Sequence, residues 1–139
     1  MAAKDLFHLI VRNALEKDNW IITEDPLYLR VSPKVGMLVD LAAHQIINAQ
    51  QEDRKIAVEV KSFVGLSNLH QFHLALGQFL NYQLALEQLE PDRTLYLAIP
   101  TDIYKEFFSD SFIQASIQRY NVKLLIFHPD KELIIQWNN

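Results

Sequence analysis

One strand in the middle of the sequence limits the fold more than any other segment. Residues 56–63 read Ile-Ala-Val-Glu-Val-Lys-Ser-Phe, a run rich in β-branched and aromatic side chains whose apolar members recur with a period of two. Side chains two residues apart in a strand lie on the same face, so Glu59 and Lys61 share one face. Charged groups in an apolar strand cost free energy unless they pair with each other or act on a ligand.

A single acid, Asp40, interrupts an earlier apolar run over residues 37–43. An aspartate on one strand and Glu-x-Lys on the next are typical of metal-dependent nucleases, whose two acids hold a divalent cation while the lysine helps to activate water. We therefore predict catalytic roles for Asp40, Glu59 and Lys61. Asp40 and Glu59 are the predicted metal ligands, together with the carbonyl of Val60. Such an oxygen-rich set suits Mg²⁺ or Mn²⁺. The alternative is structural: Asp40 pairs with a neighbour, and Lys61 neutralises Glu59.

The composition describes an ordinary globular protein. The 139 residues fit one domain, 1–139, and contain no cysteine, which suits a reducing cytoplasm. No apolar stretch approaches the ~18 residues that a membrane span requires, so we expect a soluble, cytoplasmic protein. The net charge of −4 and the pI of about 5.7 argue against binding nucleic acid through bulk charge. Binding to DNA then needs a local basic patch or a partner protein.

The order of predicted elements indicates an α/β fold. Helices are expected at 4–17, at 68–90 and at 103–120 with a break near 109–111, and strands at 20–23, 27–31, 37–43, 55–63, 94–99, 122–127 and 132–137. The last two strands form a C-terminal hairpin. We read the order as αβββαβαβ, that of a restriction-endonuclease-like core with a central mixed sheet flanked by helices.

Two local features carry further predictions. A tight turn in the polar run at 50–54 would place Asp40 opposite Gly65, roughly 16 Å along the strand from Glu59. A shared metal site therefore requires that residues 46–54 are not a simple paired hairpin end. Gly77, inside the long helix, is predicted to mark a close approach of that helix to the sheet.

Motifs along nearly the whole chain resemble the XisH-like proteins, cyanobacterial factors that control excision of the fdxN element and belong to the PD-(D/E)XK nuclease superfamily. The motifs are Ala3-Lys4-Asp5-x-Phe7-His8, Ala14-Leu15-x-Lys17-Asp18-x-Trp20-x-Ile22-Thr23-x-Asp25-Pro26, Val39-Asp40-Leu41, residues 56–63, and Ala75-Leu76-Gly77-Gln78-Phe79-Leu80-x-Tyr82. The resemblance implies the nuclease-type fold, a site on Asp40, Glu59 and Lys61, and a role in heterocyst-specific DNA rearrangement beside an XisI-like partner. It leaves open that a separate recombinase cuts the DNA.

Three helical residues complete the predicted site. Gln78 and Tyr82 lie one helical turn apart and resemble the Gln-x-x-x-Tyr pair of RecB-type nucleases, which lines the site. The alternative is a surface glutamine and a tyrosine buried for packing. His8 stands where archaeal junction-resolving nucleases carry a helix glutamate, and could act as a ligand or a base. Its alternative is a partly buried histidine on the flank of the helix.

Three classes of function remain open from the sequence. The first is a Mg²⁺- or Mn²⁺-dependent DNA endonuclease, and the second is a catalytically silent module that binds DNA or a partner and directs a separate recombinase. The third is an oligomeric scaffold, which a cleanly alternating apolar edge strand would support. The terminal strand at 133–137 alternates poorly and fits either the core or the edge of a homodimer. We predict a nuclease-like excision factor.

Overall fold

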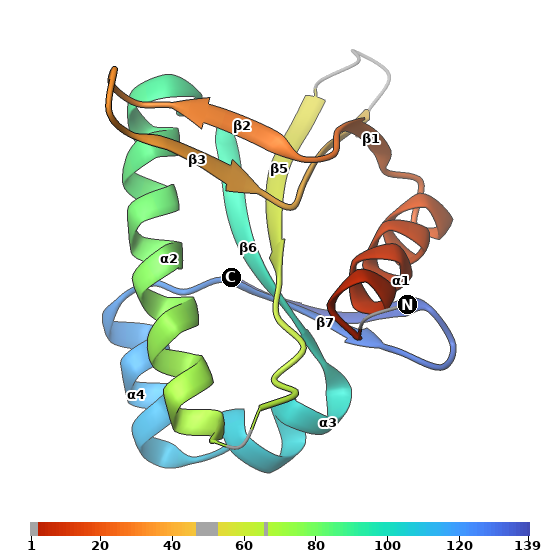
Figure 1. Cartoon of the computed structure of the whole chain (residues 1–139). Coiled ribbons are helices and arrows are strands. Elements are labelled where there is room, and N and C mark those ends of the chain that lie inside the picture. Colours follow the sequence, from red (N-terminus) through yellow and green to blue (C-terminus); the bar gives the residue numbers. More distant parts are fainter. Residues whose placement is uncertain (1–2, 47–52, 66) are drawn as a thin grey trace.

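The computed structural model describes residues 3–46, 53–65 and 67–139, which build a six-stranded mixed sheet flanked by helices (Figure 1). In chain order the elements are α1 (Ala3–Lys17), β1 (Ile21–Glu24), β2 (Leu27–Arg30), β3 (Gly36–Val39), β4 (Leu41–Ile46), β5 (Asp53–Val60), α2 (Asn68–Leu89), β6 (Arg93–Pro100), α3 (Thr101–Ile103), the π-helix η1 (Tyr104–Phe108), α4 (Ser111–Arg119), β7 (Leu124–His128) and β8 (Leu133–Asn138). The order in the sheet is β1-β4-β5-β6-β7-β8, and β2 pairs with β3 separately. The predicted fold class is confirmed.

Helices cover both faces of this sheet. On one face, Val11 and Leu15 of α1 pack against a core that includes Val58 and Tyr96. The other face carries α2, α4 and the β2–β3 hairpin (Figure 1). The strands β5, β6 and β7 are parallel and lie in the middle, so their side chains are buried on both faces.

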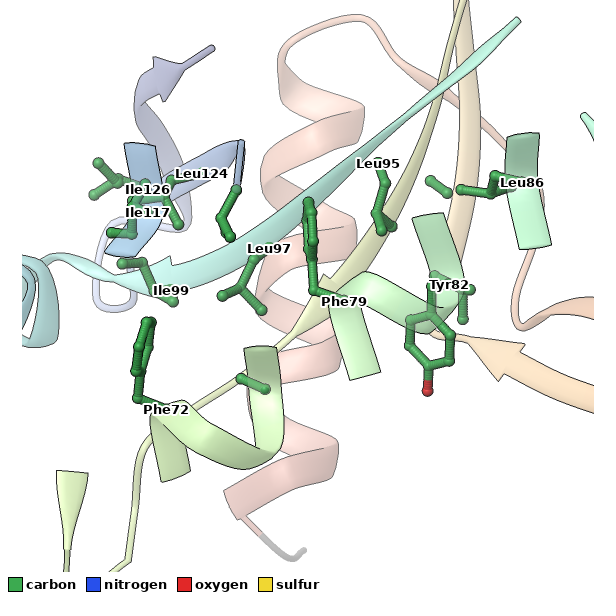
Figure 2. Close-up of a cluster of buried hydrophobic side chains, with 14 of the residues drawn as sticks. Phe72, Phe79, Tyr82, Leu86, Leu95, Leu97, Ile99, Ile117, Leu124 and Ile126 are labelled. Carbon is green, nitrogen blue, oxygen red and sulfur yellow. The ribbon is translucent and has the colours of Figure 1, made fainter. Parts of the chain in front are cut away.

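Helix α2 anchors the second core. It begins after Ser67, whose Oγ accepts the backbone N–H of His70 at 3.2 Å, as expected of a helix N-cap. Its buried face lies against β6, as Figure 2 shows for Phe72, Phe79, Tyr82 and Leu86 on the helix and Leu95, Leu97 and Ile99 on the strand. The prediction for Gly77 is wrong: it lies on the exposed side of α2, where an added Cβ would meet no atom within 4 Å beyond the helix's own backbone.

Two predicted elements are interrupted. The strand expected at 37–43 divides at Asp40, because β3 pairs with β2 whereas β4 pairs with β1 and β5. The expected break in the helix at 103–120 is confirmed, since η1 ends at Phe108 and α4 begins after Asp110. The Asp110 carboxylate accepts the backbone N–H groups of Phe112 and Ile113 and so caps α4.

The β4–β5 hairpin does not have the register of a tight turn at 50–54. Ile46 pairs with Asp53 and Leu41 with Val58, so Asp40 comes beside Glu59, as a shared site requires. Residues 46, 53 and 54 are themselves paired, contrary to the expectation for 46–54, while residues 47–52 lie outside the described part of the chain. The polar residue Arg54 belongs to the strand because its guanidinium stacks on Trp20 and Trp137, with 5.4 and 5.3 Å to the ring centroids.

No helix in the described ranges 3–46, 53–65 and 67–139 is long and apolar enough to cross a membrane.

Candidate functional site

The β4–β5 register brings Asp40 and Glu59 together. The last regular pair is Leu41 with Val58, and Asp40 follows it at the bend between β3 and β4. The backbone N–H of Asp40 donates to Oε1 of Glu59 at 3.2 Å, and the backbone N–H of Val60 donates to Oδ2 of Asp40 at 2.8 Å. Each carboxylate is thus held by the main chain beside the other, which places both predicted acids in one site.

Lys61 lies beside Glu59 on the same face of the sheet. Its Nζ is 3.4 Å from Oε2 of Glu59, and its backbone N–H donates to the carbonyl of Ala98 on β6 at 2.9 Å. The backbone bond fixes the place of Lys61 one residue beyond the end of β5. Its side chain is 25% exposed, so the ammonium reaches the surface while it contacts a buried acid.

Glu59 is 7% exposed, the one buried charged residue in the described part of the chain. Burial, and after it the neighbouring charge of Asp40, raise the pKa of Glu59 from 4.5 to about 7. The charge of Lys61 and the hydrogen bond from the Asp40 backbone act in the opposite direction. A carboxyl group with this pKa is only partly ionised at neutral pH. A cation that binds beside it would offset both the burial of its charge and the repulsion by Asp40.

His8 reaches the site from α1. Its Nδ1 is 3.9 Å from Oδ1 of Asp40, and its Nε2 is 2.7 Å from Oδ1 of Asp25, in the turn after β1. A ring held by carboxylates on both sides is restrained in orientation, as in sites where a second carboxylate positions a functional histidine. The structure therefore places His8 within the cluster.

Asp25 and Arg12 are members of this network that the sequence interpretation missed. Arg12 lies one helical turn after His8, and its guanidinium contacts Oδ2 of Asp25 at 2.5 Å. The hydrogen bond that Arg12 donates to Asp25 raises the pKa of Arg12 above its usual value. Asp25 lies between the strands expected at 20–23 and 27–31 and was given no role, although the i, i+4 spacing of His8 and Arg12 on one helix face was a signal that both could bind one acid.

The two predicted residues of α2 differ in position. Tyr82 is buried, and burial followed by the charges of Glu59 and Asp40 raises its pKa to about 12, so its ring lies near both acids. Gln78 is exposed one turn earlier, and among the described residues no hydrogen bond joins it to the site. The structure therefore brings Tyr82 to the acids, and a role for Gln78 stays a prediction.

The donor set fits a divalent cation of the Mg²⁺ type. Two carboxylates converge, one of them with a raised pKa, and Mg²⁺ in proteins commonly takes one or two carboxylates and completes its shell with water and phosphate oxygens. Within the residues that the structure describes, no group of three or more His, Cys, Asp or Glu side chains is arranged to hold a metal. Asp40 and Glu59 would therefore supply the protein's carboxylate ligands, and ligation by the Val60 carbonyl stays a prediction.

Comparisons with known proteins agree with this architecture. The family model described as XisH protein matches residues 1–135. The structure of an XisH family protein from Nostoc punctiforme PCC 73102 is 46% identical, covers 97% of this chain and 100% of that chain, and has a TM-score of 0.89. An fdxN element excision controlling factor protein from Anabaena variabilis is 46% identical, with coverages of 97% and 99% and a TM-score of 0.86. A search of curated proteins gave no match.

Proposed function

The chain belongs to the XisH family, and from this premise we propose that it is a nuclease-like factor that controls excision of an fdxN-type DNA element by divalent-metal-dependent hydrolysis of DNA phosphodiester bonds. The similar protein from Anabaena variabilis, described as an fdxN element excision controlling factor, supports the biological part of the proposal. The chemical part depends on the residues around Asp40.

One observation supports the chemistry most strongly. The main chain holds Asp40 and Glu59 beside each other, although burial and mutual repulsion raise the pKa of Glu59 to about 7. A fold that serves structure alone gains nothing from a buried carboxylate next to a second one, because each penalises the charge of the other. A bound cation offsets this penalty, which is why strongly shifted groups cluster at functional sites.

The residues around the acids fit hydrolysis at phosphorus. A divalent cation bound by Asp40 and Glu59 would supply Lewis-acid activation of a phosphoryl oxygen and of water. Lys61, whose ammonium reaches the surface, would orient the attacking water and stabilise negative charge on the phosphate. His8, whose Nε2 is held by Asp25, would accept a proton from that water on Nδ1, the ring nitrogen on the side of Asp40.

A second candidate keeps the same fold without cleavage. The Lys61 ammonium already neutralises Glu59 at 3.4 Å, and the net charge of −4 disfavours unaided binding to DNA. In this alternative the chain binds DNA or an XisI-like protein and directs a separate recombinase. A partner protein with a basic surface would strengthen DNA binding in both the nuclease and the silent binding module.

The experiment is a nicking assay on supercoiled DNA with Mg²⁺ or Mn²⁺, with and without an XisI-like protein. The proposal predicts metal-dependent conversion to open circles, and loss of at least about 100-fold in rate in the Lys61→Ala variant. Lys55→Ala is the matched control, because Lys55 lies near the start of β5, at the end opposite to Lys61, and pairs with Asp92.

Three outcomes separate the candidates. Nicking that survives in Lys61→Ala would come from another site or a contaminant and contradict the proposal. No nicking under any condition, with DNA retained on a filter, would favour the silent binding module. Equal loss of nicking in Lys55→Ala would show a general effect of charge on DNA binding rather than chemistry at Lys61.

A further inference from the structure

The β2–β3 hairpin begins and ends at the candidate site. Its two strands form a sheet of their own, whose first pair is Leu27 with Val39. Asp25 lies just before this pair in the sequence, and Asp40 comes directly after it. Because His8 lies 2.7 Å from the first of these acids and 3.9 Å from the second, the base of the hairpin is part of the site.

The two sides of the hairpin differ in their surroundings. Leu27 and Leu29 are 2% and 1% exposed and pack into the core that α2 covers. The alternate residues Tyr28 and Arg30 lie on the other side and are exposed, as is Leu38 opposite Tyr28. The inner side therefore fixes the hairpin to the protein, and the outer side is presented to solvent.

The hairpin is a basic segment next to two acids. Residues 27–39 contain Arg30 and Lys34 and no acid, although the chain as a whole has a net charge of −4. Two other cations of this region, Arg12 and Lys61, already pair with carboxylates. Within the described ranges no carboxylate oxygen lies within 4 Å of the basic groups of the hairpin, which leaves both cations able to bind an anion.

The outer side holds Arg30 in a defined position. Its guanidinium lies over the ring of Tyr28, 5.4 Å from the centroid, and its Nη1 donates to the carbonyl of Pro33 at 3.4 Å. Gly36 makes room for this ring, since an added Cβ there would lie 2.6 Å from Oη of Tyr28. A guanidinium that is already oriented loses less side-chain entropy when its planar fork binds a phosphate.

We infer that the β2–β3 hairpin binds the phosphate backbone of the DNA substrate through Arg30 and Lys34. The inference rests on the proposed function, in which the reacting phosphate lies at Asp40 and Glu59. Arg30 pairs with Gly36, four residues before Asp40, so roughly 14 Å of strand separates the pair from the acids. A DNA strand rises about 3.4 Å per nucleotide, so Arg30 meets the backbone about four nucleotides from the reacting phosphate.

Charge complementarity favours DNA as the occupant. Affinity for the phosphate backbone comes from clustered Lys and Arg side chains, and the hairpin presents two of them in a segment without acids. The remainder of the chain is acidic overall, so its field disfavours a polyanion over much of the surface and orients the DNA toward the hairpin. The net charge of −4 thereby directs the bound strand past Asp40 instead of preventing contact.

Fluorescence anisotropy with a labelled DNA oligonucleotide tests the surface. It is measured on the full chain without divalent metal, between about 50 and 200 mM salt, so binding is read apart from nicking. The double variant Arg30→Gln/Lys34→Gln should weaken binding at least about 10-fold at the lower salt and reduce the slope of log K against log salt by about 2. The matched control is Lys105→Gln/Arg119→Gln, which removes two exposed cations from η1 and α4, away from the hairpin (Figure 1), and should leave the slope unchanged.

A cross-linking measurement locates the contact directly. The chain has no cysteine, so one introduced cysteine carries one photoreactive benzophenone label. Val35→Cys, near the tip of the hairpin, should cross-link to the oligonucleotide, and Tyr120→Cys, at the end of α4, should not. Both positions are 47% exposed in the wild type, so access of the label is matched.

The outcomes separate this inference from the proposed function. Binding that depends on Arg30 and Lys34 supports the inference even if no condition gives nicking, and only the hydrolytic part of the proposed function then fails. Equal affinity and equal slope in Arg30→Gln/Lys34→Gln and wild type overturn the inference and leave the hairpin to an acidic partner protein. A wild type that binds no DNA, or cross-linking through Tyr120→Cys alone, also overturns it.

Discussion

Asp40 and Glu59 are fixed by reciprocal contacts: the Asp40 N–H donates to the Glu59 carboxylate, and the Asp40 carboxylate accepts the N–H of Val60, the next residue after Glu59. Neither side chain can turn away without losing a hydrogen bond to a charged group, worth about 1.5–3 kcal/mol. The bend between β3 and β4 therefore holds both carboxylates in place before any ligand binds.

The stability of the protein should fall as pH rises from about 4.5 to about 7. The pKa of Glu59 is raised from 4.5 to about 7 in the folded state, so the folded chain binds a proton that the unfolded chain releases. The stabilisation is complete below pH 4.5 and lost above pH 7. It amounts to on the order of 3 kcal/mol at most. Urea unfolding of wild type and Glu59→Gln across this range measures it, and the variant should lack this component.

The exposed glutamate Glu106 provides the control for that comparison, through Glu106→Gln. The account is contradicted if Glu59→Gln keeps the full pH dependence of the wild type, or if Glu106→Gln loses as much of it. Taking the difference between wild type and variant cancels the contribution of other titrating groups that both proteins share.

Replacement of Lys61 by methionine should raise the pKa of Glu59 further, because the ammonium group favours the charged carboxylate. Carboxyl carbon chemical shifts, followed by NMR through a pH titration, report the pKa directly. Lys55→Met, near the start of β5 and paired with Asp92, should leave the pKa of Glu59 unchanged. A pKa of Glu59 that falls or stays constant in Lys61→Met would show that the 3.4 Å contact has no electrostatic effect.

His8 and Asp25 should affect the rate of DNA nicking without changing the fold. His8→Ala removes the proposed base and should slow nicking by about 100-fold, within the usual range for general base catalysis. Asp25→Asn weakens the contacts that orient His8 and should slow it by about 10-fold. His128→Ala, at the turn between β7 and β8, is the control. Equal rates in His8→Ala and wild type would remove His8 from the mechanism.

The sequence was most informative where chemistry and periodicity coincide. Glu59 and Lys61 stand out because they are charged residues in an apolar alternating strand, and the long apolar helix α2 was visible from its spacing. The mixed sheet and the break before α4 followed from such patterns, and the structure confirms them. The family followed from the resemblance of motifs along the chain, and the comparisons confirm it.

Other features depend on contacts between distant residues. Arg54 looked like a turn residue, but its guanidinium lies over two tryptophans far away in the sequence, and it pairs with Gln45 in the register that unites the acids. Asp25 was given no role from the sequence, since its partners on α1 are 13 and 17 positions away. Gly77 was assigned to the wrong side of α2, because a single glycine does not indicate the direction of a close approach.

Calorimetric titration with Mn²⁺ at pH 7 tests most directly whether Asp40 and Glu59 form one divalent-ion site. The account predicts a single saturable site in the wild type and its loss in Asp40→Asn, with binding intact in Asp53→Asn, whose exposed acid pairs with His44. Because the pKa of Glu59 is about 7, binding should also release a fraction of a proton, seen as heat that changes with the buffer. A wild type that binds no Mn²⁺, or an Asp40→Asn variant that binds it equally well, would contradict the account.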